Sequence, residues 1–143
     1  MLPVKPHDEE EHRQAVTKVV KALVKQMHSS IEIIACPILR EVDGLAMSSR
    51  NALLNAEERK IAGLIPAMMQ KANEVLQNEG VELAKLFIKK ETNLHSLMKL
   101  DYYEICDAKT LNILSVIEPG RKSISLIALY VGKIRLIDNL LIN

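Results

Sequence analysis

The sequence predicts a mixed α/β (α+β) protein in which helices cover a small three-stranded antiparallel sheet. Apolar residues recur at helical spacing over 16–27 and 61–76, with charged residues between them. A near-continuous apolar run over 31–39 has the β-branched content of a strand, and two further runs close the chain on either side of Gly132-Lys133, a hairpin turn signal. The 143 residues are 48% hydrophobic, which is enough to build a core for one domain, or one and a half small ones.

Composition excludes several classes of protein. Nineteen basic and 18 acidic residues give a formal net charge of +1, and the chain has one Phe and no Trp, so neither a nucleic-acid partner nor a charged membrane surface is indicated. No apolar run is long enough to cross a bilayer, and no signal peptide is visible. The two cysteines, Cys36 and Cys106, form neither a metal motif nor a disulfide framework, so we expect a cytoplasmic protein.

The first forty residues are expected to be the edge of a larger unit. Residues 1–14 are polar and acidic and are predicted to be a lead-in. A helix is predicted over 16–27, ended by His28-Ser29-Ser30, and an apolar strand over 31–39. A helix that feeds such a strand is typical of the end of a βαβ unit, and the strand then needs parallel neighbours that the chain does not supply.

The middle of the chain predicts a loop and then a helix. Asp43-Gly44 is a turn signal within a loop over 40–55. Asn55 and Glu58 have the spacing of a capping box, and an apolar stripe follows to position 76. Pro66 lies inside that stripe, so the helix should either kink or restart there, and 78–80 should end it.

The last third predicts the sheet. A further helix is predicted over 81–98, and strands over 100–106, 123–131 and 134–141. Residues 107–114 should form a short helical turn or an irregular link, Pro119-Gly120 a type II turn and Gly132-Lys133 a type II′ turn.

Most chemical motifs are absent from the sequence. The five glycines are too scattered for a Walker A loop or a dinucleotide fingerprint, and no two of the four histidines are spaced i, i+4. No Ser-His-Asp or Cys-His set can be assembled from spacing. The residues therefore predict no catalytic group and no metal ligand in this chain.

One segment, Met47-Ser48-Ser49-Arg50, has the groups that hold phosphate oxygens. Hydroxyls donate single hydrogen bonds, and a guanidinium offers a permanently charged, bidentate fork. On these residues alone an alternative stays open, in which a serine caps a helical turn and Arg50 belongs to a surface ion pair.

The sequence around this segment resembles the signature of the pantothenate synthetase (pantoate–β-alanine ligase) family. The resembling stretch is Arg40 to Asn51 (REVDGLAMSSRN), followed by Leu54 and Glu58-Arg59. Residues 34–39 (IACPIL) look like the strand that leads into the signature. Tyr103-Glu104-Ile105 and 135–139 (RLIDN) look like the family's C-terminal strands. The resemblance covers roughly residues 16–143.

The resemblance implies a two-domain enzyme of pantothenate and coenzyme A biosynthesis. Residues 1–40 would be a leader plus the last helix–strand unit of a Rossmann-like nucleotide-binding domain, and 41–143 the small C-terminal α/β domain. The family condenses pantoate with β-alanine using ATP and Mg²⁺, through a pantoyl-adenylate intermediate. Carried over here, Ser48, Ser49 and Arg50 would bind the ATP phosphates, Met47 would belong to the same ATP-binding loop, and the backbone of Leu39 would contact the adenine. Mg²⁺ would be bound mainly by the other domain. Independently of the resemblance, the unpaired apolar run over 31–39 exposes a strand edge, so we expect a homodimer, or a swapped or rearranged N-terminal segment.

The chain also departs from the family pattern. The family's His-x-Gly-His motif and its pantoate- and magnesium-binding residues belong to the first domain and are absent. A Gly-x-Lys-Asp-x-x-Gln motif is expected near residues 10–16, where Glu10, Glu11, His12, Arg13 and Val16 do not match it. We therefore expect the chain to be inactive alone, as a C-terminal part with an unrelated leader or as a truncated copy. The alternative function is a non-catalytic α/β module for packing or subunit interaction.

Overall fold

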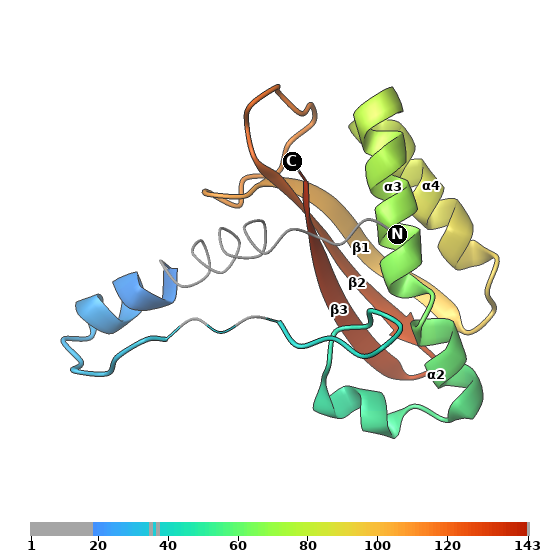
Figure 1. Ribbon diagram of the computed structural model, residues 1–143, viewed down its shortest axis with the longest axis horizontal. Helices are drawn as coiled ribbons and strands as arrows, with labels where there is room; N and C mark the ends of the chain where they lie inside the picture. The colour runs from blue at the N-terminus through green and yellow to red at the C-terminus, as the bar shows by residue number, and fades with distance from the viewer. Residues whose placement is uncertain (1–18, 35, 37, 143) are drawn as a thin grey trace.

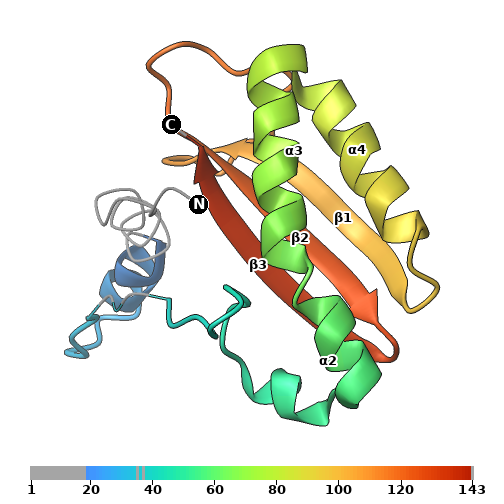
Figure 2. The same ribbon diagram turned by 45° about the vertical axis from the view of Figure 1, so that its right-hand side comes forward.

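The computed structural model describes residues 19–34, 36 and 38–142, which contain a three-stranded antiparallel sheet covered by helices. The strands are β1 (Met98–Asp107), β2 (Ser123–Val131) and β3 (Ile134–Ile142), in the spatial order β1-β2-β3. Helices α3 (Ile65–Glu79) and α4 (Val81–Asn93) lie side by side on one face of the sheet (Figures 1 and 2). The predicted fold class is confirmed. None of the described helices has the length and apolar content needed to cross a membrane.

The core lies between these two helices and the sheet. Apolar side chains of α3, α4 and all three strands are buried there; the bulkiest that are fully buried are Ile65, Met69, Leu76, Ile88, Ile105, Ile127, Leu129 and Val131. Alternate residues of a strand point to opposite faces, so the helix-covered face takes one set of side chains. The other set lies on the second face, which α3 and α4 leave open (Figure 2).

The helix predicted after Asn55 is two helices. The first, α2 (Ala56–Ala62), begins with the predicted capping box: the Asn55 side chain accepts from the Glu58 N–H, and the Glu58 carboxylate accepts from the Asn55 N–H. The second, α3, has Pro66 in its first turn, where a missing N–H costs no hydrogen bond. Pro66 therefore restarts the helix.

Helix α4 ends at Asn93, earlier than the predicted 98. Met98 pairs with Val131 at the start of β1, and the Leu97 carbonyl accepts from the Gly132 N–H at 2.8 Å. Pairing with β2 thus ends the helix early, because Leu97 and Met98 bond to the sheet. Leu94, which the prediction placed inside the helix over 81–98, is exposed.

Both predicted turns are present. The Arg121 N–H donates to the Glu118 carbonyl at 3.1 Å, and Gly120 has φ +80°, as a type II turn requires. Gly132 has φ +58° at the first position of the β2–β3 turn, as type II′ requires.

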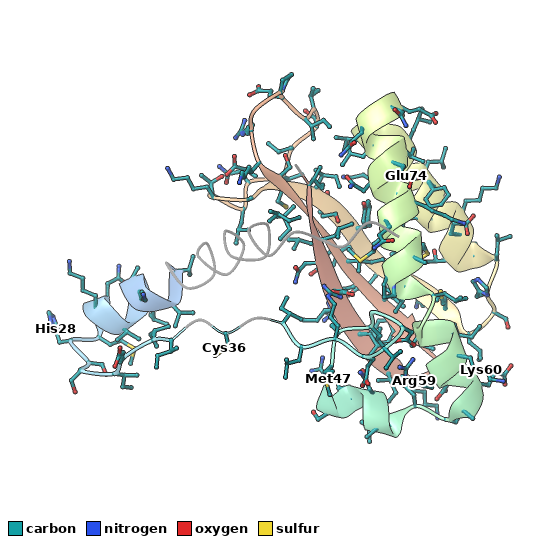
Figure 3. All side chains as sticks on the ribbon, in the orientation of Figure 1. His28, Cys36, Met47, Arg59, Lys60 and Glu74 are labelled. Carbon is teal, nitrogen blue, oxygen red and sulfur yellow. The ribbon has the colours of Figure 1, made fainter. Side chains whose placement is uncertain are left out.

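The N-terminal segment differs from expectation. Residues 19–26 are helical, as predicted, while the predicted helix start and the lead-in over 1–14 lie outside the described residues. The strand predicted over 31–39 is not formed at its described positions, of which only the last, Leu39, is hydrogen-bonded to another segment, at Met47. A parallel strand exists only beside its neighbours, and the described chain offers none. The segment extends away from the sheet, and its Cys36 is exposed and free (Figure 3).

Candidate functional site

Residues 39–47 form a small antiparallel hairpin that brings the Ser-Ser-Arg segment beside β3. The Met47 N–H donates to the Leu39 carbonyl at 2.9 Å, and Arg40 bridges Ala46. The chain reverses at Gly44, whose φ of +86° favours glycine, and whose missing Cβ leaves room for Pro66.

Three contacts fasten this hairpin to the domain. Leu45 is 3% exposed and inserts into the core. The Asp43 carboxylate receives two hydrogen bonds from Arg59 of α2, at 2.6 and 3.2 Å, and the Arg59 guanidinium holds the pKa of Asp43 below its usual range. The Arg40 guanidinium forms a fork on the Asp138 carboxylate of β3 at 3.0 and 3.1 Å. The loop is therefore tied to both a helix and the sheet.

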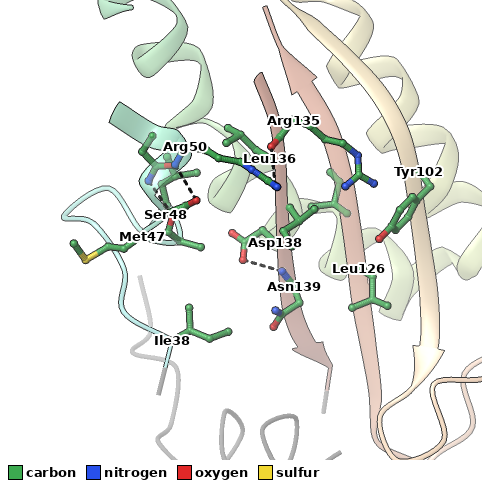
Figure 4. Close-up of a pocket in the computed structure, with 15 residues that line it drawn as sticks. Ile38, Met47, Ser48, Arg50, Tyr102, Leu126, Arg135, Leu136, Asp138 and Asn139 are labelled. Carbon is green, nitrogen blue, oxygen red and sulfur yellow. Dashed lines mark hydrogen bonds between the residues drawn. The ribbon is translucent and has the colours of Figure 1, made fainter. Parts of the chain in front are cut away.

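The Ser48 hydroxyl oxygen accepts from the Arg50 N–H at 3.2 Å and caps the 3-10 helix η1 (Ser49–Leu53). The capping half of the alternative interpretation is thus correct. The ion-pair half is not supported, because no carboxylate pairs with Arg50 among the described residues. The Arg50 side chain reaches across toward β3, where its Nη1 makes only a long 3.5 Å contact with the Arg135 carbonyl (Figure 4).

A pocket of about 350 Å³ lies between this loop and the open face of the sheet (Figure 4). One wall comes from the loop and η1, the other from the three strands. The loop wall consists of Ile38, Leu45, Ala46, Met47, Ser48, Arg50 and Asn51. The sheet wall consists of Tyr102, Leu126, Ile127 and the residues 135–139. The pocket combines an aromatic ring and aliphatic side chains with hydroxyl and guanidinium donors at its rim.

The charges around the pocket favour an anion. Arg135 is engaged by Asp101, with N···O distances of 2.8 and 3.0 Å, and Asp138 by Arg40. Arg50 is therefore the guanidinium left without a carboxylate among the described pocket residues. Asn51 also lines the pocket: its side-chain oxygen is buried with no hydrogen-bond partner among the described residues, while its amide nitrogen donates to the Ala46 carbonyl at 3.0 Å.

The five residues predicted to bind ATP do not all meet in the pocket. Met47, Ser48 and Arg50 line it. Ser49 is exposed as the first residue of η1, and Leu39 is exposed with its carbonyl bonded to the Met47 N–H; neither lines the pocket. The assignment of all five stays a prediction.

Sequence reasoning missed the groups of the sheet wall. Tyr102 and Arg135 come from strands that are far from the loop in sequence, and the contact of Arg40 with Asp138 spans 98 residues. Both Arg40 and Asp138 lie in stretches that resemble the family, but a single sequence holds no signal that pairs them.

The described residues do not fit a magnesium site. They contain no group of three or more His, Cys, Asp or Glu side chains that could hold a metal ion. The carboxylate on the pocket, Asp138, already accepts the fork of Arg40. Hard cations need several oxygen ligands, so no chemical step is assigned to a metal here.

Comparison with known proteins identifies the family. The family model described as pantoate-beta-alanine ligase matches residues 11–141. The chain belongs to this family. The pantothenate synthetase of Clostridium acetobutylicum is 43% identical over 85% of this chain and 43% of its own length, and that of Clostridioides difficile is 44% identical over the same shares. This chain spans about half the length of the curated relatives it matches.

Solved structures of the family agree with the fold. The crystal structure of pantothenate synthetase from Thermus thermophilus matches with a TM-score of 0.69 and 33% identity, over 85% of this chain and 44% of that one. The pantoate-beta-alanine ligase of Francisella tularensis, complexed with beta-gamma ATP and beta-alanine, matches with a TM-score of 0.53 and 28% identity, over 87% and 38%. The resemblance seen in the sequence is confirmed.

Proposed function

We propose that this chain supplies the phosphate-binding wall of the ATP site in a ligase that joins pantoate to β-alanine through pantoyl adenylate. The observation that carries the proposal is Arg50, which reaches over the pocket with no carboxylate partner among the described residues, next to the Ser48 hydroxyl. Family membership supplies the reaction class. The complex of the Francisella tularensis relative with beta-gamma ATP and beta-alanine supports these two substrates.

In the first proposed step, a carboxylate oxygen of pantoate attacks the α-phosphorus of ATP. The α–β bridging P–O bond breaks, and its electron pair leaves with pyrophosphate. Arg50 would stabilise the negative charge that develops on this leaving group. The Ser48 oxygen accepts the Arg50 N–H, so its own O–H proton stays available for a phosphate oxygen. Ser49, beside it on η1, and Met47 would complete the phosphate side.

In the second proposed step, the β-alanine amine attacks the acyl carbon of pantoyl adenylate. The C–O bond to the phosphate breaks, its electron pair leaves with AMP, and the nitrogen gives up a proton to solvent to form the amide. Leu39 would lie at the adenine end of the nucleotide, where its carbonyl has a second lone pair beyond the one that accepts the Met47 N–H. Magnesium would be held by groups outside the described residues.

The proposed division of the chain follows from this arrangement. Residues 41–143 would be the C-terminal domain, and 1–40 a leader plus a helix–strand remnant of the nucleotide-binding domain. This chain would supply one side of the ATP site and no assigned pantoate ligand, whereas holding two substrates in reacting geometry commonly lowers a barrier by about 7–11 kcal/mol. We therefore expect the 143-residue chain alone to form no pantothenate from ATP, pantoate and β-alanine. Turnover above background in a mass-verified sample would contradict this.

The decisive test is Arg50→Ala in an enzyme of the relatives' length that has this chain as its C-terminal half. Loss of one donor aimed at developing charge should lower kcat by about 10²- to 10³-fold and raise KM less. Arg50→Lys should recover only part of the rate, because it keeps the charge and loses the fork. Lys71→Ala, on the exposed side of α3, is the matched control and should change neither constant. Near-normal adenylation by Arg50→Ala with an intact thermal melt would refute the proposal.

A second candidate function, subunit interaction, is favoured by the exposed apolar side chains of residues 19–39. Leu23, Met27, Ile31 and Ile34 are all exposed in this segment. We propose that they bring two cytoplasmic copies together as a homodimer. Sedimentation of the chain across a hundredfold concentration range tests this: a monomer throughout would contradict it, and Ile31→Ser with Ile34→Ser should weaken any dimer.

A further inference from the structure

The Arg40 side chain makes an unusual number of hydrogen bonds for a loop residue. Nη1 donates to the Gly44 carbonyl at 2.9 Å and to Asp138 Oδ2 at 3.0 Å. Nη2 donates to Asp138 Oδ1 at 3.1 Å and to the Asn139 carbonyl at 3.2 Å. Four of the five N–H donors of the guanidinium are thus in use, and they join the tip of the hairpin to the middle of β3.

The acceptor of this fork, the Asp138 carboxylate, also has its hydrogen-bonding capacity in use. The Asp138 side chain is 3% exposed, and its Oδ1 also accepts from the Asn139 N–H at 2.7 Å. Both carboxylate oxygens are therefore occupied. A guanidinium fork on a buried carboxylate fixes distance and orientation together, because both partners are planar.

The fork joins the two walls of the pocket. Arg40 stands at the base of the hairpin, where its backbone bridges Ala46, and Met47 and Ser48 follow directly. Asp138 and Asn139 belong to the opposite, sheet wall. The other ionic contact of the loop, Asp43 with Arg59, leads to α2 and is half exposed, and the contact of Arg50 with β3 is a single 3.5 Å bond.

We propose that Arg40, through Asp138, is a positioning residue that holds Ser48 and Arg50 at a fixed separation from β3, and so sets the width of the phosphate site. This inference rests on the proposed function for its ligand. Arg40 has nearly all its donors in use and is not itself assigned a contact with phosphate.

The key variant is the double replacement Arg40→Met with Asp138→Leu in the 143-residue chain. Met is close to Arg in volume and Leu has the same branched skeleton as Asp, and apolar replacement of a buried ion pair commonly leaves stability unchanged or raised. If the ion pair only stabilises the fold, the double variant should keep the order of the loop. If the ion pair positions the loop, the domain should stay stable while the loop becomes more mobile. Arg40→Lys keeps the charge without the fork and is the second variant. Arg121→Met, which breaks the ion pair with the mostly buried Asp107 outside the pocket, is the control.

Three readouts are needed: the thermal melt, amide hydrogen exchange of Met47 and Arg50, whose N–H groups are both hydrogen-bonded, and the NMR shifts of these amides titrated with ATP and with inorganic pyrophosphate. The double variant should melt like the wild type, exchange faster at these two amides, and bind both anions up to about 10²-fold more weakly. Arg40→Lys should be intermediate in affinity. Arg121→Met should lower the melt and leave exchange and affinity at the two amides unchanged.

Contrary results distinguish failure of the positioning role of Arg40 from failure of the proposed phosphate site. Unchanged exchange in the double variant would overturn the positioning role whatever the anions do, and faster exchange with wild-type anion affinity would also overturn it. If Arg50→Ala responds to ATP and pyrophosphate as the wild type does, the proposed phosphate site fails, and with it the ligand that Arg40 is said to position. In that case faster exchange would still identify the fork as what orders the loop.

Discussion

Two regions of the chain, residues 54–142 and residues 19–39, have apolar side chains at regular spacing. Only the first region buries them. Ile88 of α4 and Ile105 of β1 are 0% exposed, whereas Ile34 is 75% exposed. In the first region each apolar face meets another inside the chain, α3 and α4 against the sheet. In the second, the described chain has no surface to meet it. Periodicity thus predicts an element and the face it would bury, but burial itself depends on a partner.

The loop that forms one wall of the pocket is intermediate between the packed and the exposed region. Its Leu45 is buried in the core and its Arg40 is fixed on β3, while Met47, Ser48 and Arg50 remain exposed. A binding site needs this combination, because an anchored backbone can present unpaired donors without losing geometry.

The largest effect expected from this comparison is that of Ile105→Ala. The side chain is fully buried between the sheet and the helices, so the variant loses transfer free energy and leaves a cavity. The free energy of unfolding should fall by about 2–5 kcal/mol, measured by urea denaturation monitored by circular dichroism.

Ile34→Ala is the matched control, since it deletes the same atoms from the exposed segment. It should change the free energy of unfolding of the monomer, measured at a concentration too low for any dimer, by less than about 0.5 kcal/mol. A loss comparable to that of Ile105→Ala would show that residues 19–39 are packed in solution, and would break the contrast between the two regions.

The fold was predictable where the signals are local and the partners lie in the chain. The capping box at Asn55, the restart at Pro66 and the turns at Gly120 and Gly132 each depend on three or four consecutive residues, and all are present. The absence of a strand over 31–39 was not predictable in this way, because a strand forms only when a second strand pairs with it. The end of α4 was misjudged for the same reason, since pairing of Met98 with Val131 decides it.

The site was predictable only in its loop half. Hydroxyl and guanidinium groups that are adjacent in sequence, with the resemblance around them, point to Ser48 and Arg50. The sheet wall and the fork of Arg40 on Asp138 arise from long-range folding, which no local pattern in one sequence reports.

Asp107→Asn tests the connection between β1 and β2 and should have an intermediate effect. The Asp107 carboxylate accepts from Arg121 Nε at 2.6 Å, and from the Lys109 and Thr110 N–H groups and the Thr110 hydroxyl. These donors, the Arg121 guanidinium first, hold the pKa of Asp107 far below its usual range. At pH 7 the variant should lose about 1–3 kcal/mol of unfolding free energy.

The pH dependence of this loss has a definite sign. Because the pKa is lower in the folded state, the stabilisation is fully present above the unfolded value of about 3.9 and is lost as the pH falls below it. The gap between wild type and Asp107→Asn should therefore be constant from pH 7 to pH 5 and narrow toward pH 3. Glu118→Gln, which removes the exposed second partner of Arg121, should show little change at any of these pH values. A gap independent of pH would mean that the charge of Asp107 is not what stabilises the link.

Controls aside, the smallest effect is expected at the capping box, which joins the pocket loop to the core. Asn55→Ala removes the acceptor of the Glu58 N–H at the start of α2 and should cost about 1 kcal/mol, whereas Asn55→Ser should retain most of the stability. Because α2 is also held by the buried Ala62 and by the Arg59 contact with Asp43, only its first turn should loosen. The slope of the urea transition should then equal that of the wild type, since the surface exposed on unfolding is unchanged. A loss well above about 2 kcal/mol, or a changed slope, would show that the cap holds the loop as well as the helix end. Residues 40–55 would then unfold together with the packed region 54–142.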